Sequence, residues 1–156
     1  MTVHKTLMYN PGTIDCLSSG LVKVNIEVDF FEQIKRFNEM YNLPNNDTYT
    51  DQGNVRANNF FSILKEELEE IGELEKHTEP RERATIVADL LGDIIVYCAS
   101  EARRWGIPIE QVLDIIMESN FSKLDTDGKP LYDERGKVLK GPNYWSPNDK
   151  IKELFK

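Results

Sequence analysis

The chain has 156 residues, with 27 acidic against 19 basic side chains and a formal net charge of −8. This length predicts one domain with its own hydrophobic core, and the acidic balance argues against nucleic-acid and anionic-membrane partners, which require clustered positive charge. Two cysteines, Cys16 and Cys98, cannot supply a disulfide framework. Because the sequence shows neither a signal peptide nor a long uncharged apolar run, we expect a soluble, cytoplasmic protein.

The N-terminal half predicts an arm followed by two helices. Residues 1–25 mix turn formers with isolated apolar residues, and we interpret them as an arm that precedes a single helical domain over residues 26–156. Apolar residues from Val28 to Tyr41 recur at helical spacing and predict the first helix. A cluster of turn formers predicts a loop over residues 43–54, and the second helix is predicted over residues 56–77.

The C-terminal half predicts two long helices and an irregular segment. Proline suits the first turn of a helix and glycine its end, so the third helix is predicted from Pro80 to Trp105. "PIEQVLDIIMESNFSK" predicts a fourth helix. Farther on, "DERGK" predicts a small hairpin, and Ser146 is the expected N-cap of a last helix over residues 147–155. The fold class is therefore all-α, a four- to five-helix bundle with an irregular C-terminal segment.

The third predicted helix carries two acids where a buried helix has none. Between Ala84 and Ser100, Asp89 and Asp93 are the only charged residues, and they lie one turn apart. A buried ionised carboxylate is costly unless it pairs with a cation or binds a metal. Two interpretations follow: a metal site, or salt bridges to Lys or Arg from other helices.

The second predicted helix carries acids on its apolar side as well. On a helical wheel, Glu67 falls inside the apolar sector of "NNFFSILKEELEEIGELEK" and Glu70 at its edge. An exposed acidic run is the alternative interpretation of such a stretch. Four carboxylates converging from two packed helices would make an all-oxygen site for Mg²⁺ or Mn²⁺. These four are Glu67, Glu70, Asp89 and Asp93.

Residue spacing excludes two other carboxylate sites. A di-iron bundle requires Glu-x-x-His on two helices, and neither His4 nor His77 stands in that motif. The segment "DTDG" with Glu134 matches part of a calcium loop, but Lys123 would occupy its first position, where a carboxylate is required. The divalent-cation site between the second and third helices is therefore the interpretation we keep.

Polar residues after the fourth helix are candidates for substrate contact. Lys123 and Lys140 can offer ammonium groups to phosphate oxygens, and Asn120 can contact a metal-bound ligand. Tyr144 can stack on a base or pack the tail against the domain. Ordinary solvation is the alternative for each lysine taken alone.

The segments "EELEE", "ADLLGD", "MESNFSK" and "DGKPLYDERGKVLKGPNY", in this order, resemble the all-α nucleoside triphosphate pyrophosphohydrolases. The most similar branch is the MazG-like and phosphoribosyl-ATP-pyrophosphohydrolase-like one, over residues 28–149. The resemblance implies cleavage of a free nucleoside triphosphate between its α and β phosphates, giving a monophosphate and pyrophosphate with two or more Mg²⁺ or Mn²⁺ ions. It also implies a homodimer or homotetramer.

Carried over by position, the first acidic motif of the family falls on Glu66, Glu67 and Glu70, and its second ends at Asp93. The sequence departs from that second motif because the residue three before Asp93 is Leu90, and the acid is Asp89, four before. Glu66 or Glu67 is the candidate catalytic residue that activates water. The expected metal ligands are Glu67, Glu70, Asp89 and Asp93, and the expected substrate contacts are Asn120, Lys123, Lys140 and Tyr144.

The choice of base and sugar rests on the resemblance alone. Short family members of this kind trim dNTP pools and some act on guanine nucleotides, which favours a purine such as dGTP or GTP. Two alternatives remain open. One is a pyrophosphatase for pyrimidine nucleotides of the dUTP or dCTP type, and the other is a non-catalytic helical oligomer that binds nucleotide.

Overall fold

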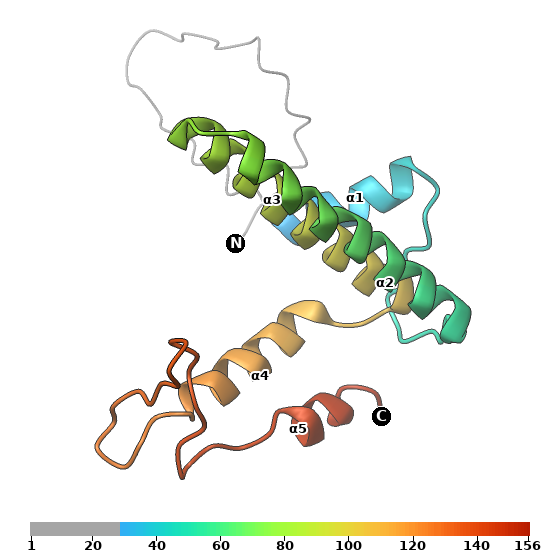
Figure 1. Ribbon diagram of the computed structural model, residues 1–156. Helices are drawn as coiled ribbons and strands as arrows, with labels where there is room; N and C mark the ends of the chain where they lie inside the picture. The colour runs from blue at the N-terminus through green and yellow to red at the C-terminus, as the bar shows by residue number, and fades with distance from the viewer. Residues whose placement is uncertain (1–28) are drawn as a thin grey trace, which may run out of the picture.

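The computed structural model describes residues 29–156, and this part of the chain is all-α, as the sequence predicts (Figure 1). Its elements are α1 (Phe30–Met40), α2 (Gly53–Glu69), the 3₁₀ helix η1 (Glu70–Lys76), α3 (Pro80–Trp105), α4 (Ile109–Phe121) and α5 (Asn148–Glu153). The predicted arm lies outside the described residues. Within residues 29–156, no helix combines the length and apolar character that a membrane crossing requires.

Local capping explains where the helices begin and end. The prediction for α3 is confirmed at both ends, because the Glu79 side chain accepts a hydrogen bond from the Glu82 amide and Gly106 adopts a left-handed φ of 63°. The helix α2 begins at Gly53 rather than at the predicted residue 56. The Asp51 side chain accepts a hydrogen bond from the Gly53 amide at 2.9 Å. The predicted hairpin is reduced to one antiparallel bridge between Tyr132 and Val138.

The prediction of one continuous helix over residues 56–77 is wrong beyond Glu69. From Glu70 onward the chain forms η1, a 3₁₀ helix with three residues per turn, so its side chains rotate away from their positions on an α-helical wheel. Ile71, an apolar residue of η1, is 51% exposed. The last helix also begins later than predicted, with Pro147 rather than Ser146 as its N-cap.

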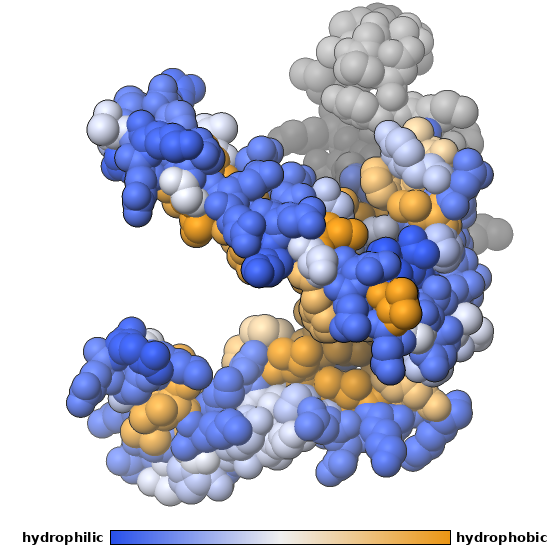
Figure 2. All heavy atoms as spheres, turned by 45° about the vertical axis from the view of Figure 1, so that its right-hand side comes forward, coloured by the Kyte–Doolittle hydropathy of each residue, from blue (hydrophilic) through white to orange (hydrophobic). Residues whose placement is uncertain are grey.

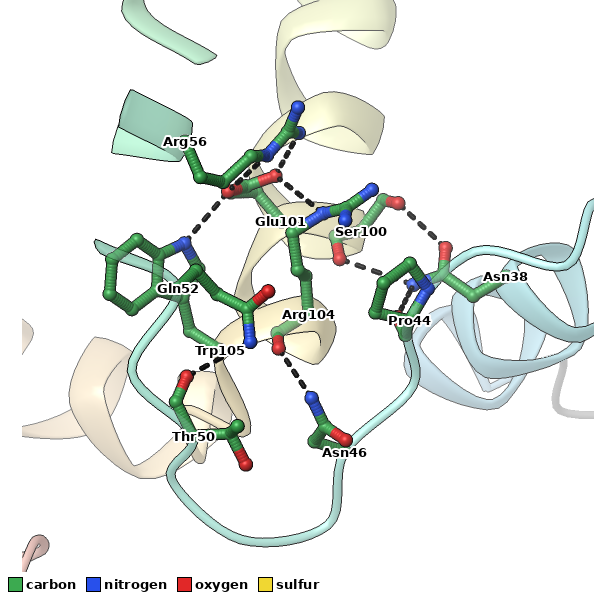
Figure 3. Close-up of polar contacts among 10 residues, drawn as sticks. All are labelled: Asn38, Pro44, Asn46, Thr50, Gln52, Arg56, Ser100, Glu101, Arg104 and Trp105. Carbon is green, nitrogen blue, oxygen red and sulfur yellow. Dashed lines mark hydrogen bonds and ion pairs between the residues drawn. The ribbon is translucent and has the colours of Figure 1, made fainter. Parts of the chain in front are cut away.

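A buried carboxylate joins α2 to the end of α3 (Figure 3). Glu101 is only 7% exposed, and its Oε1 accepts hydrogen bonds from Arg56 Nε at 3.0 Å and Trp105 Nε1 at 2.7 Å. Its Oε2 forms ion pairs with both Arg56 and Arg104. Burial lowers the pKa of Arg104, and the positive charge of Arg56 lowers it further. Several donors therefore replace water around the buried Glu101 carboxylate.

The loop between α1 and α2 closes the C-terminal end of α3. The last carbonyls of a helix have no partner within the helix, and here the loop supplies donors to them. The Asn46 amide donates to the Arg103 carbonyl at 2.8 Å, and its side chain donates to the Arg104 carbonyl at 2.6 Å (Figure 3). The Thr50 amide donates to the Trp105 carbonyl at 2.8 Å. The loop and the helix end therefore form one fixed junction.

The described helices form two groups that meet at this junction (Figure 1). We call them the α2–α3 arm and the α4 arm, and neither includes the predicted N-terminal arm of residues 1–25. In one arm α1, α2 and η1 pack on α3, and in the other α4 packs with α5. The ring of Phe155, after α5, meets the ring of Tyr49 in the loop at a centroid distance of 5.3 Å. Figure 2 shows an open cleft between the arms, with apolar side chains on both of its walls. Four hydrophobic residues of the described part are buried: Ile34, Leu90, Ala99 and Ala102.

Replacing Asn38 should destabilise the α2–α3 arm. Asn38 is fully buried, and its Nδ2 donates to the carbonyls of Pro44 at 3.0 Å and Ser100 at 3.2 Å, while its Oδ1 accepts from Ser100 Oγ. Asn38→Ala leaves these groups unpaired, which should lower the free energy of unfolding by about 1–3 kcal/mol. Urea denaturation measures this change.

The matched control is Asn59→Ala, because Asn59 is an exposed asparagine on α2. It should shift the free energy of unfolding by no more than about 0.5 kcal/mol. Equal effects of the two substitutions would contradict the structural role of Asn38.

Candidate active site

The predicted acidic residues lie along the hairpin formed by α2, η1 and α3. Glu66 and Glu67 belong to α2, Glu70 is the first residue of η1, and the two aspartates lie on α3. Glu67 is half-buried, and the other four are exposed: Glu66, Glu70, Asp89 and Asp93. The prediction that Asp89 and Asp93 are buried is therefore wrong. Leu90 is the buried residue of that segment, and the aspartates flank it on a different side of α3.

Tyr97 marks the point at which three of these acids gather. Its phenol has a raised pKa, mainly because the charge of Glu67 disfavours the phenolate and a hydrogen-bonding interaction with Glu67 favours the neutral form. Burial raises the pKa of Tyr97 further, and the charges of Asp93 and Glu70 add to the shift. Asp89 does not contribute. Negative charge from α2, η1 and α3 is therefore concentrated around one hydroxyl group.

The geometry of antiparallel helices explains this gathering. Side chains on an α-helix tilt toward its N-terminus. The helices α2 and α3 run in opposite directions in the hairpin (Figure 1). This tilt therefore directs the side chains of Glu67 and Tyr97 toward one another. Sequence reasoning missed Tyr97, although a signal was present: Tyr97 follows Asp93 by four residues, which places both on one face of α3.

The acids lie along the same hairpin but do not converge on one point. Among residues 29–156, no group of three or more His, Cys, Asp or Glu side chains is close enough to hold a metal ion. The donor chemistry nevertheless suits a hard divalent cation, which prefers carboxylate oxygens. The alternative of salt bridges receives no support in this part of the chain, because none of the five acids takes part in its ion pairs.

The four predicted substrate contacts form a second group, at the far end of α4. The Gly141 amide donates to the Lys123 carbonyl at 2.8 Å, which joins the segment of Lys140 and Tyr144 to the end of the helix. Gly141 leaves no room for a Cβ, which would overlap the Leu124 carbonyl. The Lys140 ammonium lies over the Tyr144 ring, 4.5 Å from its centroid. Asn120 is exposed on the last turn of α4.

Two serines of α4 and its C-cap strengthen this attachment. Ser119 is buried, and its Oγ donates to the Trp145 carbonyl at 2.8 Å. The Trp145 amide donates to Ser122 Oγ at 3.2 Å. The irregular segment after α4 is therefore held against the helix by hydrogen bonds that use side chains as well as backbone.

The five predicted acids and the four predicted substrate contacts lie on different arms. The acids belong to the α2–α3 arm and the lysines to the α4 arm, and the cleft separates the two arms (Figures 1 and 2). A single chain in this arrangement does not bring the lysines onto the acids.

No protein-family model matches the chain, and no curated protein matches it. One similar solved structure is a protein from Exiguobacterium sp. 255-15, provisionally described as an NTP pyrophosphohydrolase. It shares 18% sequence identity with this chain, covering 81% of this chain and 94% of the other, with a TM-score of 0.48.

The titration of Tyr97 tests the arrangement of the acids. The phenol should ionise at higher pH than an ordinary tyrosine, and Glu67→Gln should lower its pKa because the substitution removes the largest source of negative charge. Carbon NMR of the tyrosine Cζ atoms across alkaline pH follows each hydroxyl separately. The control is Glu75→Gln, an exposed acid of η1 that does not contribute to the shift. An unchanged pKa in Glu67→Gln would refute the placement of Glu67 beside Tyr97.

Proposed function

We propose that this protein is a metal-dependent nucleoside triphosphate pyrophosphohydrolase. The observation that carries the proposal is the placement of Glu67, Glu70 and Asp93 on the packed elements α2, η1 and α3, and the raised pKa of Tyr97 agrees with it. These acids have no basic partner among the ion pairs of the described residues, and carboxylate oxygens are the ligands that hard divalent cations prefer. The order of the acidic and lysine-containing segments along the sequence supports the same function.

The reaction adds water to the α-phosphorus of a nucleoside triphosphate. A bond forms between the water oxygen and the α-phosphorus, and the bond from that phosphorus to the αβ bridging oxygen breaks, which releases pyrophosphate and a nucleoside monophosphate. Glu66 or Glu67 is the proposed base that orients the water and accepts its proton. Glu66 is exposed and Glu67 half-buried, so both are accessible to solvent for that role.

The proposed cofactor is two or more Mg²⁺ or Mn²⁺ ions, held by Glu67, Glu70, Asp89 and Asp93. Such ions, when bound, neutralise phosphate charge and lower the pKa of water. Of the four proposed ligands, Asp89 is the one that does not contribute to the raised pKa of Tyr97. Tyr97 is the proposed residue that positions the Glu67 carboxylate, whose charge raises the pKa of its phenol.

Lys123 and Lys140 are the proposed contacts to the phosphates, with Asn120 and Tyr144 beside them. Ammonium groups stabilise the negative charge that develops on phosphate oxygens during the reaction. Because these residues lie on the α4 arm, this role requires the α4 arm of this chain or of a second copy to lie along the hairpin. For the base, we favour dGTP or GTP over dUTP or dCTP.

Pyrophosphate release from a panel of nucleoside triphosphates, with and without Mg²⁺ or Mn²⁺, tests the proposal. Glu67→Gln and Asp93→Asn should each lower the rate by about 100-fold or more, because each removes a charge from the reacting centre. Two exposed acids outside the group supply matched controls, Glu75→Gln and Asp114→Asn, which should retain the wild-type rate.

Each failure of this experiment has a distinct meaning. No release from any nucleotide, combined with stabilisation by nucleotide in a thermal melt, would replace the proposal with non-catalytic nucleotide binding. Release that persists in both Glu67→Gln and Asp93→Asn would keep the activity and overturn the site.

A further inference from the structure

Residues 145–156 run back beside α4 toward the junction of the two arms (Figure 1). They include α5, which packs with α4. Beyond α5, the ring of Phe155 meets the ring of Tyr49 edge to face, with 63° between the ring planes. Because Tyr49 belongs to the loop that closes the end of α3, residues 145–156 contact both arms. We name this segment the strap.

Several contacts of different kinds attach the strap to α4. The Trp145 carbonyl accepts a hydrogen bond from the buried Ser119, and the Trp145 amide donates to Ser122 Oγ. The Lys150 ammonium forms an ion pair with Glu118 at 3.1 Å. The same ammonium lies over the Trp145 ring, 4.0 Å from its centroid. The loss of one contact would leave the others in place, so the strap and α4 should move as one unit.

The attachment of the strap to the α2–α3 arm is much weaker. Within residues 29–156, no hydrogen bond or ion pair joins the strap to that arm. The contact is the aromatic pair of Phe155 and Tyr49, whose residues are 38% and 52% exposed. We name this pair the latch. An aromatic pair changes an equilibrium by about 2- to 10-fold, so the latch can open and close.

The chain connection between the arms is loosely packed. Gly106 is fixed at the end of α3, because a Cβ there would overlap the Thr48 carbonyl, and backbone hydrogen bonds hold the chain as far as Ile107. The helix α4 begins at Ile109. Two cavities of about 170 and 260 Å³ adjoin this connection, and both are lined by Ile107 and Ile109. Atoms that border a cavity lack the contacts that resist displacement, so α4 can turn at Pro108.

We infer that the strap sets the angle between the arms: the closed latch holds α4 in place, and an open latch lets α4 turn about Pro108. The packing of α4 is with α5, whereas the helices of the α2–α3 arm pack on one another. The cleft shown in Figure 2 gives α4 space to move. The inference does not depend on the pyrophosphohydrolase activity. One consequence does rest on that proposed function, namely that the latch controls how closely Lys123 and Lys140 approach the acids.

Distance measurements between the arms by pulsed EPR test the inference. Spin labels are attached to cysteines at two exposed positions, Glu75→Cys on η1 and Asp114→Cys on α4. Cys16→Ser and Cys98→Ser remove the native thiols. Labelled chains are diluted with unlabelled chains, so that each measured distance lies within one chain. The chain with an intact latch should give one narrow distance distribution.

Phe155→Ala and Tyr49→Ala each remove one ring of the latch. Each should broaden the distance distribution, because the ratio of closed to open latch falls by about 2- to 10-fold. The double variant should match the single variants, since both substitutions break the same contact. Phe155→Tyr keeps an aromatic ring and should retain the narrow distribution. Phe121→Ala is the matched control, because Phe121 is 67% exposed and forms no aromatic pair within residues 29–156.

Circular dichroism verifies that each variant retains its helices. Three results would overturn the inference. A distribution that stays narrow in Phe155→Ala would show that the latch does not hold α4. A distribution that is already broad with the latch intact would show that α4 moves freely. Broadening in the double variant beyond that of either single variant would show that Phe155 and Tyr49 act separately.

Discussion

The buried carboxylate of Glu101 is the constraint on which the rest of the structure depends. It joins α2, through Arg56, to the last turns of α3, and it does so where the loop of residues 43–52 closes the helix end. A buried charge tolerates little displacement, since a shift of one turn would leave Glu101 or Arg56 unpaired in a poorly solvated position. This ion pair therefore sets the register of α2 against α3.

The register places the acidic group. Tyr97 lies about one turn before Glu101 on α3, and Glu67 lies roughly three turns beyond Arg56 on the antiparallel α2. With side chains tilted toward the N-terminus of each helix, the Tyr97 hydroxyl and the Glu67 carboxylate approach from opposite directions. The same junction sends α4 away from the hairpin, which leaves the apolar walls of the cleft without a partner in the same chain. Site and exposed surfaces thus have a common origin at Glu101.

The helices and their order could be predicted from the sequence, because Pro80 and Gly106 delimit α3 and apolar periodicity marks the others. Local capping shifted the ends of several helices from their predicted residues. The change to a 3₁₀ helix at Glu70 could not be predicted from the spacing of apolar residues. Asp89 and Asp93 are exposed. The prediction that they are buried was wrong because it assumed a bundle closed within one chain. Tyr97 was missed because a neutral phenol does not belong to an acidic motif.

We propose that the carboxylates around Tyr97 form a site for a divalent cation. The most direct measurement is a titration with Mn²⁺ followed by NMR, because the paramagnetic ion broadens the signals of nuclei near its binding site. The claim predicts that substoichiometric Mn²⁺ first broadens the signals of Tyr97, Glu67 and Asp93, and that Glu67→Gln removes this selectivity. Broadening that begins at the acids of residues 125–134, or spreads evenly over the acidic surface, would contradict it.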